Sequence, residues 1–148
     1  MYNVDIFKGY NGKTLIGLPP EQIIKIMPNY EKTLWGFDGA RRDFSYELIA
    51  YYDKSNEICT SITFINTDTE VYIDDVQFMG IKEEELVTRL KNTFPFDDIF
   101  TDGEFYTYPK KALCFFITEG CVGGITVGAK GFFDFVMDKT APSNERKI

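Results

Sequence analysis

Histidine does not occur anywhere in this chain of 148 residues. Because histidine is the commonest general base and a frequent metal ligand, its absence excludes the usual Ser-His-Asp and Cys-His forms of nucleophilic catalysis. The Gly-x-Gly-x-x-Gly and Walker spacings that hold phosphates are missing as well, although residues 122–131 are rich in glycine. The sequence therefore predicts a protein that is not an enzyme and that uses no cofactor.

Cysteines and long apolar runs are scarce. The three cysteines, Cys59, Cys114 and Cys121, are odd in number and show no Cys-x-x-Cys spacing, which argues against a disulfide framework or a zinc site. No apolar run approaches the roughly 18–20 residues that a membrane-spanning helix needs. Residues 1–13 lack the basic and apolar regions of a signal peptide. We expect a cytoplasmic protein with buried cysteines and no membrane contact.

Positive charge is rare in one part of the chain. The net charge is −7, and residues 66–104 hold eleven acidic residues against three basic ones, whereas the remainder of the chain is nearly balanced. Proteins that bind the phosphates of nucleic acids need the opposite sign of charge. We therefore exclude nucleic acid as a direct partner.

Aromatic residues are abundant, at 16% of the chain with 14 Phe and 9 Tyr. This enrichment favours strands. The turns between the expected strands are too short for crossover helices, so the strands should pair in an antiparallel sheet. The expected strands cover residues 44–53, 57–65, 70–78, 104–108, 111–117, 121–127 and 132–137.

Two stretches of the chain are nearly alike. Residues 15–27 read LIGLPPEQIIKIM and residues 78–90 read FMGIKEEELVTRL, which places Gly17 on Gly80 at an offset of 63 residues. Matches at this offset continue without a gap as far as Asp138. A constant offset over this length indicates an internal duplication.

Each copy is expected to begin with a short helix. Apolar residues at helical spacing predict a helix over residues 20–28, and the same stripe recurs at Leu86, Val87 and Leu90. A glycine precedes each helix, where it can form a tight turn.

The predicted fold class is α+β. Two tandem helix-plus-antiparallel-strand repeats, at about residues 12–74 and 75–137, should form one continuous antiparallel sheet with the short helices packed on it, because about 60 residues rarely bury a core alone. Residues 1–138 would make a single domain, and the polar tail 139–148 is expected to be disordered.

The acidic segment has features of a metal site and of an acid–base pair, but both are incomplete. Residues 94–108 resemble a calcium loop, but Phe100 and Pro109 stand where ligands are needed, so we expect no metal. The neighbouring pairs Asp74–Asp75 and Asp97–Asp98 could act as acid and base, but nothing in the sequence places them across a cleft.

The same segment interleaves acids with aromatic residues, a combination found on surfaces that bind basic proteins. A solvated acidic face with no partner explains the pattern equally well. The predicted partner-binding residues are Asp74, Asp75, Asp97, Asp98, Asp102, Glu104, Tyr106 and Tyr108.

The doubled helix start, Gly-[Leu/Ile]-x-x-Glu-x-[Ile/Leu]-[Ile/Val], followed each time by antiparallel strands, resembles the tandem repeats of the β-lactamase inhibitory proteins. It is also similar to acidic immunity proteins of contact-dependent and other polymorphic bacterial toxin systems. The resemblance implies inhibition by occlusion, in which the chain covers the active site of a cognate basic toxin domain, such as a nuclease. The lack of a signal peptide favours a cytoplasmic toxin over a periplasmic lactamase.

Two other functions remain open. The chain could be a small-ligand-binding module that uses an aromatic sheet face as its pocket. It could also be an accessory factor of an envelope complex, against which the missing signal and lipid-anchor sequences argue.

Overall fold

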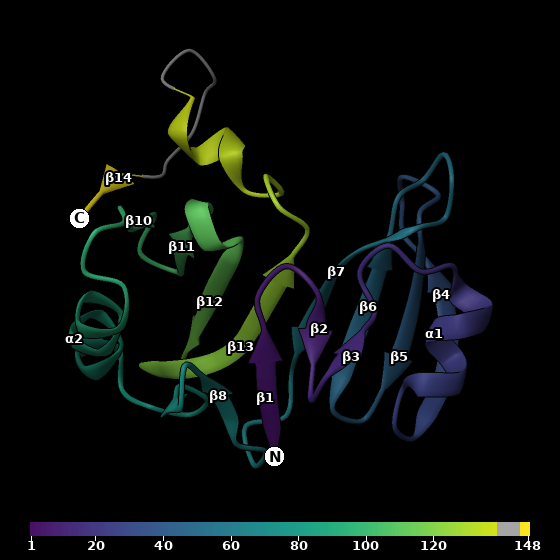
Figure 1. The fold of residues 1–148 in the computed structure, drawn as a ribbon, viewed down its shortest axis with the longest axis horizontal. Helices are drawn as coiled ribbons and strands as arrows, with labels where there is room; N and C mark the ends of the chain where they lie inside the picture. The colour runs from purple at the N-terminus through teal and green to yellow at the C-terminus, as the bar shows by residue number, and fades with distance from the viewer. Residues whose placement is uncertain (139–145) are drawn as a thin grey trace.

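The computed structural model describes residues 1–138 and 146–148, which form two sheets, two α-helices and two short 3-10 helices (Figure 1). The helices are α1 (Pro20–Ile26), α2 (Glu83–Thr93), η1 (Pro109–Lys111) and η2 (Asp134–Met137). The fold is therefore mixed α+β and mainly sheet, with mostly antiparallel pairing, which confirms the predicted class.

The large sheet has nine strands in the order β14-β10-β11-β12-β13-β7-β6-β5-β4, and every neighbouring pair is antiparallel. Its strands are β4 (Tyr30–Trp35), β5 (Arg41–Ser45), β6 (Leu48–Tyr52), β7 (Cys59–Phe64), β10 (Phe100–Thr101), β11 (Phe105–Tyr108), β12 (Leu113–Thr118), β13 (Cys121–Gly128) and β14 (Arg146–Lys147).

The prediction of one continuous sheet is confirmed only in part. The strands that follow α1 and α2 do form one sheet, but a second sheet of five strands is present in the order β3-β2-β1-β8-β9. Its strands are β1 (Tyr2–Asp5), β2 (Gly9–Tyr10), β3 (Lys13–Thr14), β8 (Val71–Ile73) and β9 (Val76–Gln77). β1 and β8 pair in parallel, which joins the start of the chain to its middle.

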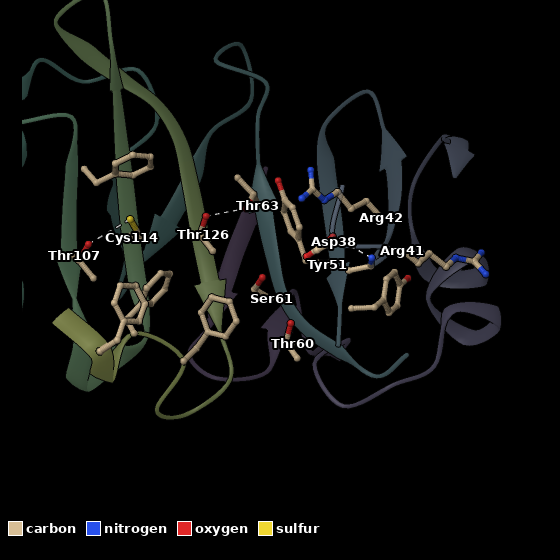
Figure 2. Close-up of a pocket in the computed structure, with 16 residues that line it drawn as sticks. Asp38, Arg41, Arg42, Tyr51, Thr60, Ser61, Thr63, Thr107, Cys114 and Thr126 are labelled. Carbon is tan, nitrogen blue, oxygen red and sulfur yellow. Dashed lines mark hydrogen bonds between the residues drawn. The ribbon is translucent and has the colours of Figure 1, made fainter. Parts of the chain in front are cut away.

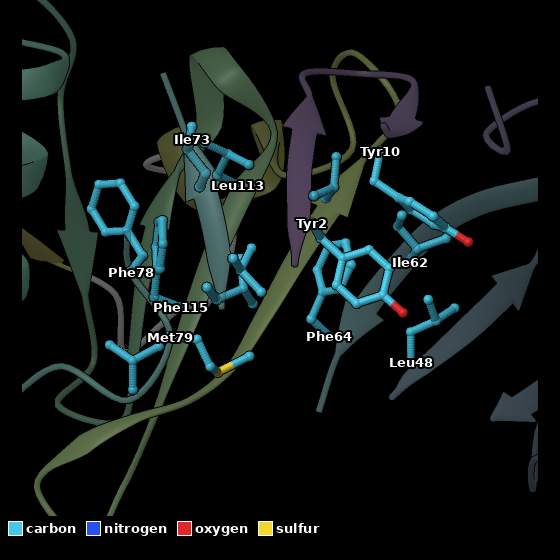
Figure 3. Packing of buried hydrophobic residues seen from close by; sticks show 14 of the residues in the cluster. Tyr2, Tyr10, Leu48, Ile62, Phe64, Ile73, Phe78, Met79, Leu113 and Phe115 are labelled. Atoms are coloured by element: carbon cyan, nitrogen blue, oxygen red, sulfur yellow. The ribbon is translucent and has the colours of Figure 1, made fainter. Parts of the chain in front are cut away.

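The core lies between the two sheets. Figure 3 shows Tyr2 and Tyr10 of the small sheet packed over Phe64 of the large sheet, with ring centroids 4.9 Å apart for Tyr2–Phe64 and 5.8 Å for Tyr10–Phe64. Phe78 packs on Phe115 in the same way at 5.3 Å. The small sheet therefore covers one face of the large sheet. We call the opposite face, which carries Thr63 and Thr126, the open face.

Both α-helices follow a glycine with positive φ, +95° at Gly17 and +77° at Gly80, as expected for a tight turn. Backbone hydrogen bonds tie the turn before α1 to β7, from the Gly17 amide to the Cys59 carbonyl (2.8 Å) and from the Cys59 amide to the Leu18 carbonyl (2.9 Å). The turn before α2 makes two such bonds to β13, from Gly80 to Val122 (2.9 Å) and from Val122 to Ile81 (2.8 Å).

Four strands of the large sheet, β4 to β7, follow α1, and the next four, β10 to β13, follow α2; the ninth strand, β14, lies at the end of the chain. The two groups meet where β7 pairs with β13, and Thr63 lies directly opposite Thr126. Their hydroxyl oxygens are 2.8 Å apart. In Figure 1 the two helices consequently lie at opposite ends of the molecule.

Three predicted strands differ in the structure. The stretch 44–53 is broken at Ser45, whose hydroxyl accepts the Leu48 amide (3.0 Å) and so turns the chain from β5 into β6. The stretch 70–78 is a hairpin, because Asp74 and Asp75 both take positive φ (+48° and +63°) and reverse the chain between β8 and β9. The stretch 132–137 contains η2 in place of a strand, after a tight turn from Ala129 to Phe132.

The structure also bears on the predictions for the three cysteines and for the C-terminal tail. Cys59 and Cys114 are buried as expected, whereas Cys121 is only half-buried. Of the predicted disordered tail, residues 139–145 lie outside the described residues, and β14 pairs with β10. No helix in the described part of the chain is both long and apolar enough to cross a membrane.

Candidate functional site

Two surfaces are candidates, and the first is an acidic region around α2. Figure 1 shows α2, β10, β11 and β14 together at one end of the molecule. The Tyr106 hydroxyl joins β11 to α2 by donating to the Glu83 carboxylate (2.6 Å). We call this region the acidic end, and its members are Glu83, Glu84, Glu85, Asp97, Asp98, Asp102 and Glu104.

The predicted aspartates of the acidic end have different environments. Asp98 is exposed and lies 3.3 Å from the Lys147 ammonium of β14, whereas Asp97 is half-buried. Asp102 supports the turn between β10 and β11 by accepting the amides of Glu104 (2.9 Å) and Phe105 (2.8 Å). Burial alone would raise the pKa of Asp102, but these amides outweigh it and hold the pKa below its usual value. Glu104 is exposed.

Asp74 and Asp75 do not belong to this group. Both are exposed in the turn between β8 and β9 of the small sheet, and no described contact joins them to the acidic end. Their positive φ angles give them a structural reason to be aspartates, because Asp tolerates this backbone region better than most residues.

Tyr106 and Tyr108 are buried, with 8% and 0% of their surface exposed, so the interpretation of their rings as partner anchors is corrected. They share one face of β11, and that face packs into the core. Burial raises the pKa of both phenols. The Tyr108 hydroxyl donates to the carbonyls of Phe94 and Asp97.

Phe96, which is not among the predicted partner-binding residues, is an exposed ring next to the acidic end. It is 98% exposed, and it sits in the loop between α2 and β10. Its flanking residues, Pro95 and Asp97, are the available signal, because a ring between a proline and two aspartates is placed in a turn at the surface. Phe105, 37% exposed on β11, faces away from Tyr106 and Tyr108 and lines the groove described next.

The second candidate is a groove on the open face, with a volume of about 510 Å³ (Figure 2). Strands from both halves of the large sheet form its floor, and the turn before β5 and the segment 132–135 form its sides. Its lining residues used below are Asp38, Arg41, Arg42, Tyr51, Thr60, Thr63, Thr107, Cys114, Thr126, Phe105, Phe132, Phe133 and Phe135.

The floor of the groove is polar. Figure 2 shows Thr63 and Thr126 between the pair Thr107–Cys114 on one side and Tyr51 on the other. The Thr107 hydroxyl lies 3.5 Å from the Cys114 sulfur. These side chains line the open face because their neighbours in the strands point into the core, as strand geometry requires.

Close packing over β13 shapes one side of the groove. A Cβ atom at Gly128 would lie 2.8 Å from the Phe132 Cβ, so only glycine lets the ring come this near to the strand. Phe132 packs edge-on against Phe133 with centroids 4.9 Å apart, and Phe135 is more exposed, at 59%.

The two arginines of the groove differ in their partners. The Arg41 guanidinium lies 3.1 Å from the carboxylate of Asp43, which is completely buried. Asp43 also accepts the hydroxyls of Thr33 and Tyr52, at 2.6 Å each. The pKa of Tyr52 is raised mainly by burial and, to a smaller extent, by its hydrogen bond to Asp43. This network holds β4, β5 and β6 together.

The Arg42 guanidinium, by contrast, makes no hydrogen bond or ion pair with any described residue. Its guanidinium carbon lies 5.4 Å from the centroid of the Tyr51 ring, in a cation–π arrangement. Figure 2 shows the guanidinium and the ring side by side at the edge of the groove.

The last two features to consider are possible metal-binding clusters and the thiol of Cys59. In the described part of the chain no three His, Cys, Asp or Glu side chains lie together in a way that could hold a metal ion. Burial raises the pKa of the Cys59 thiol to about 12, which keeps it protonated and unreactive.

Comparison with known proteins gives no family. No protein-family description, curated protein or solved structure matches this chain. The function is therefore argued from the two surfaces alone.

Proposed function

We propose that this protein is a non-enzymatic inhibitor: an immunity protein that binds a cognate basic toxin domain in the cytoplasm and covers its active site. The observation that carries the proposal is the nearly complete exposure of Phe96 beside the acidic end. A partner surface would bury this ring, and the surrounding carboxylates would attract a basic protein and orient it.

The exposed ring is held in place from below. The Tyr108 hydroxyl contacts the carbonyls of Phe94 and Asp97, which lie on either side of Phe96. A fixed loop loses little conformational freedom when it binds, so more of the contact energy remains for affinity. Burying a phenylalanine contributes roughly 1.5–3 kcal/mol, which suits an anchor residue.

The charge of the acidic end fits a basic partner. Glu84, Glu85, Asp98 and Glu104 are exposed; Lys147 pairs with Asp98 and Arg89 with Glu85. If the toxin is a nuclease, these carboxylates would occupy the groove that normally binds phosphates. Such an encounter is accelerated at low salt and screened at high salt.

We further propose that the chain arose by tandem duplication of a helix-plus-four-strand unit. The backbone hydrogen bonds of the turns before α1 and α2 support this. The donor and acceptor residues of the two bonds before α2 each lie 63 positions after those of the two bonds before α1. Thr63 and Thr126, which pair where β7 meets β13, are also 63 residues apart in the sequence. Equivalent residues would lie opposite each other in this way if a two-fold axis related β7 to β13. Such a doubled unit resembles the architecture of the β-lactamase inhibitory proteins.

The test is a complex with the product of the gene immediately upstream, co-expressed and purified. We expect a one-to-one complex by size-exclusion chromatography, loss of the partner's activity within it, and weaker binding at high salt. Phe96→Ala should weaken binding about 30-fold, the effect of losing about 2 kcal/mol at a hot spot. Asp98→Lys should weaken it about tenfold and reduce the dependence on salt.

Two matched variants serve as controls. Phe37, in the turn between β4 and β5, is at least as exposed as Phe96, and Figure 1 places β4 and β5 at the opposite end of the molecule from α2, so Phe37→Ala should bind normally. Asp68 is exposed in the same acidic segment of the sequence but outside the acidic end, so Asp68→Lys should have little effect. Equal losses in the Phe96 and Phe37 variants would contradict the proposed surface. A folded protein that leaves the partner's activity intact would contradict the function.

The groove supports small-ligand binding as a second candidate function. Its volume of about 510 Å³ is in the range of pockets that bind small molecules, and it combines aromatic walls with a polar floor.

A further inference from the structure

The charged side chains of the groove include one without a partner. Asp38 accepts the Ala40 amide (3.0 Å), and Arg41 is paired with buried Asp43. Among the described residues, the Arg42 guanidinium has no hydrogen-bond or ion-pair partner and contacts the ring of Tyr51. A guanidinium held on an aromatic ring keeps its five donors available for an anion and offers them in a planar array that suits a carboxylate, sulfonate or phosphate.

Aromatic side chains stand on the other side of the groove. Phe105 of β11 and the rings of segment 132–135 line it there, and Phe132 and Phe135 are 38% and 59% exposed. Flat apolar molecules bind such surfaces through burial and ring stacking. The hydroxyls of Thr63 and Thr126 lie on the floor of the groove and can bond polar atoms in the middle of a ligand.

We propose that this groove binds a small organic anion with a flat aromatic body, with its acidic group on Arg42 and its rings against the phenylalanines. This inference rests on the second candidate function and is independent of the acidic end. The net charge of −7 opposes the unspecific binding of anions, so saturable binding of an anion would require a local cation such as Arg42.

Two fluorescent probes with the same ring system test the proposal on the purified full-length chain. 8-Anilinonaphthalene-1-sulfonate carries a sulfonate, and N-phenyl-1-naphthylamine is the same molecule without it. We expect both to bind one-to-one in fluorescence titrations, with the sulfonate bound about tenfold more tightly, the size of one charge-assisted contact. Circular dichroism and the urea midpoint verify that each protein is folded.

Variants separate the two halves of the site. Arg42→Gln should remove the preference for the sulfonate and leave the neutral probe unchanged. Phe135→Ala should weaken both probes several-fold, because it removes part of the wall that both contact. Arg146→Gln is the matched control, since it makes the same change on β14, outside the groove, and should alter neither probe.

Each outcome decides a separate point. Equal affinity of the two probes for the wild type, or an unchanged sulfonate affinity in Arg42→Gln, would overturn the assignment of an anionic ligand while leaving small-ligand binding in place. If neither probe binds saturably to the folded protein, both the inference and the second candidate function fail. Neither result bears on the complex with a toxin.

Discussion

At the scale of single residues, two buried tyrosines differ in whether their hydroxyl groups are hydrogen-bonded. The Tyr10 hydroxyl is buried without a hydrogen-bond partner among the described residues, whereas the Tyr52 hydroxyl donates to the buried carboxylate of Asp43. We expect Tyr10→Phe to leave the free energy of unfolding unchanged or raise it by about 1 kcal/mol, because it removes an unsatisfied polar group. Tyr52→Phe should lower it by roughly 1–3 kcal/mol, since Asp43 loses a donor.

Urea unfolding followed by circular dichroism measures both effects. The two variants make the same chemical change at buried sites, so each controls for the other. A loss of stability in Tyr10→Phe as large as that in Tyr52→Phe would show that the Tyr10 hydroxyl is bonded after all.

At the scale of elements, the two turns before the α-helices should respond alike to substitution. Gly17 and Gly80 have positive φ, and an added Cβ atom would meet no atom closer than 3.6 Å at either position. The cost of alanine is therefore backbone strain, about 1–2 kcal/mol of unfolding free energy in each variant.

The control for this prediction is Gly124→Ala. Gly124 lies within β13, has ordinary strand geometry, and its Cβ atom would make contacts of 3.6 Å or more. Alanine there should be neutral or slightly stabilising, because it lowers the entropy of the unfolded chain. Urea midpoints of the three variants compare the effects, and unequal losses at Gly17 and Gly80 would argue against the equivalence of the two units.

At the scale of the whole molecule, buried tyrosines should make the fold sensitive to alkali. Burial raises the pKa of Tyr2, Tyr52, Tyr106 and Tyr108, and it raises that of Tyr10 to about 12. In the unfolded chain tyrosines titrate near pH 10. Above that pH the unfolded state releases protons that the folded state retains, so the free energy of unfolding falls as the pH rises from about 10 to about 12.

The measurement combines urea midpoints between pH 8 and 11.5 with tyrosinate absorbance at 295 nm. We expect a constant midpoint up to about pH 9, where the buried Cys59 thiol begins to contribute, and a steep decrease above pH 10. The absorbance should rise in two steps, the second together with the loss of the circular dichroism signal. A single step near pH 10 that involves all nine tyrosines of an intact fold would contradict the prediction.

The sequence determined the local structure of this protein. Helical spacing located α1 and α2, the glycines before them were recognised as turns, and β7, β11, β12 and β13 were predicted within one or two residues, because these signals depend on near neighbours in the chain. The candidate site was predicted less well. The acids of residues 97–104 do lie together at one end, but Asp74 and Asp75 lie elsewhere in a hairpin turn.

The tertiary structure alone decided which face of each strand is covered. Alternation along β11 places Tyr106 and Tyr108 on one face of the strand and Phe105 on the other. It does not determine which of the two faces is buried. That choice depends on contacts distant in sequence, such as Tyr2 on Phe64 and the parallel pairing of β1 with β8. The small sheet, formed by such distant segments, covers one face of the large sheet and leaves Arg42 and the groove on the other. The residue pattern could not determine this choice, because it encodes the periodicity of a strand but not the position of the segment that packs on it.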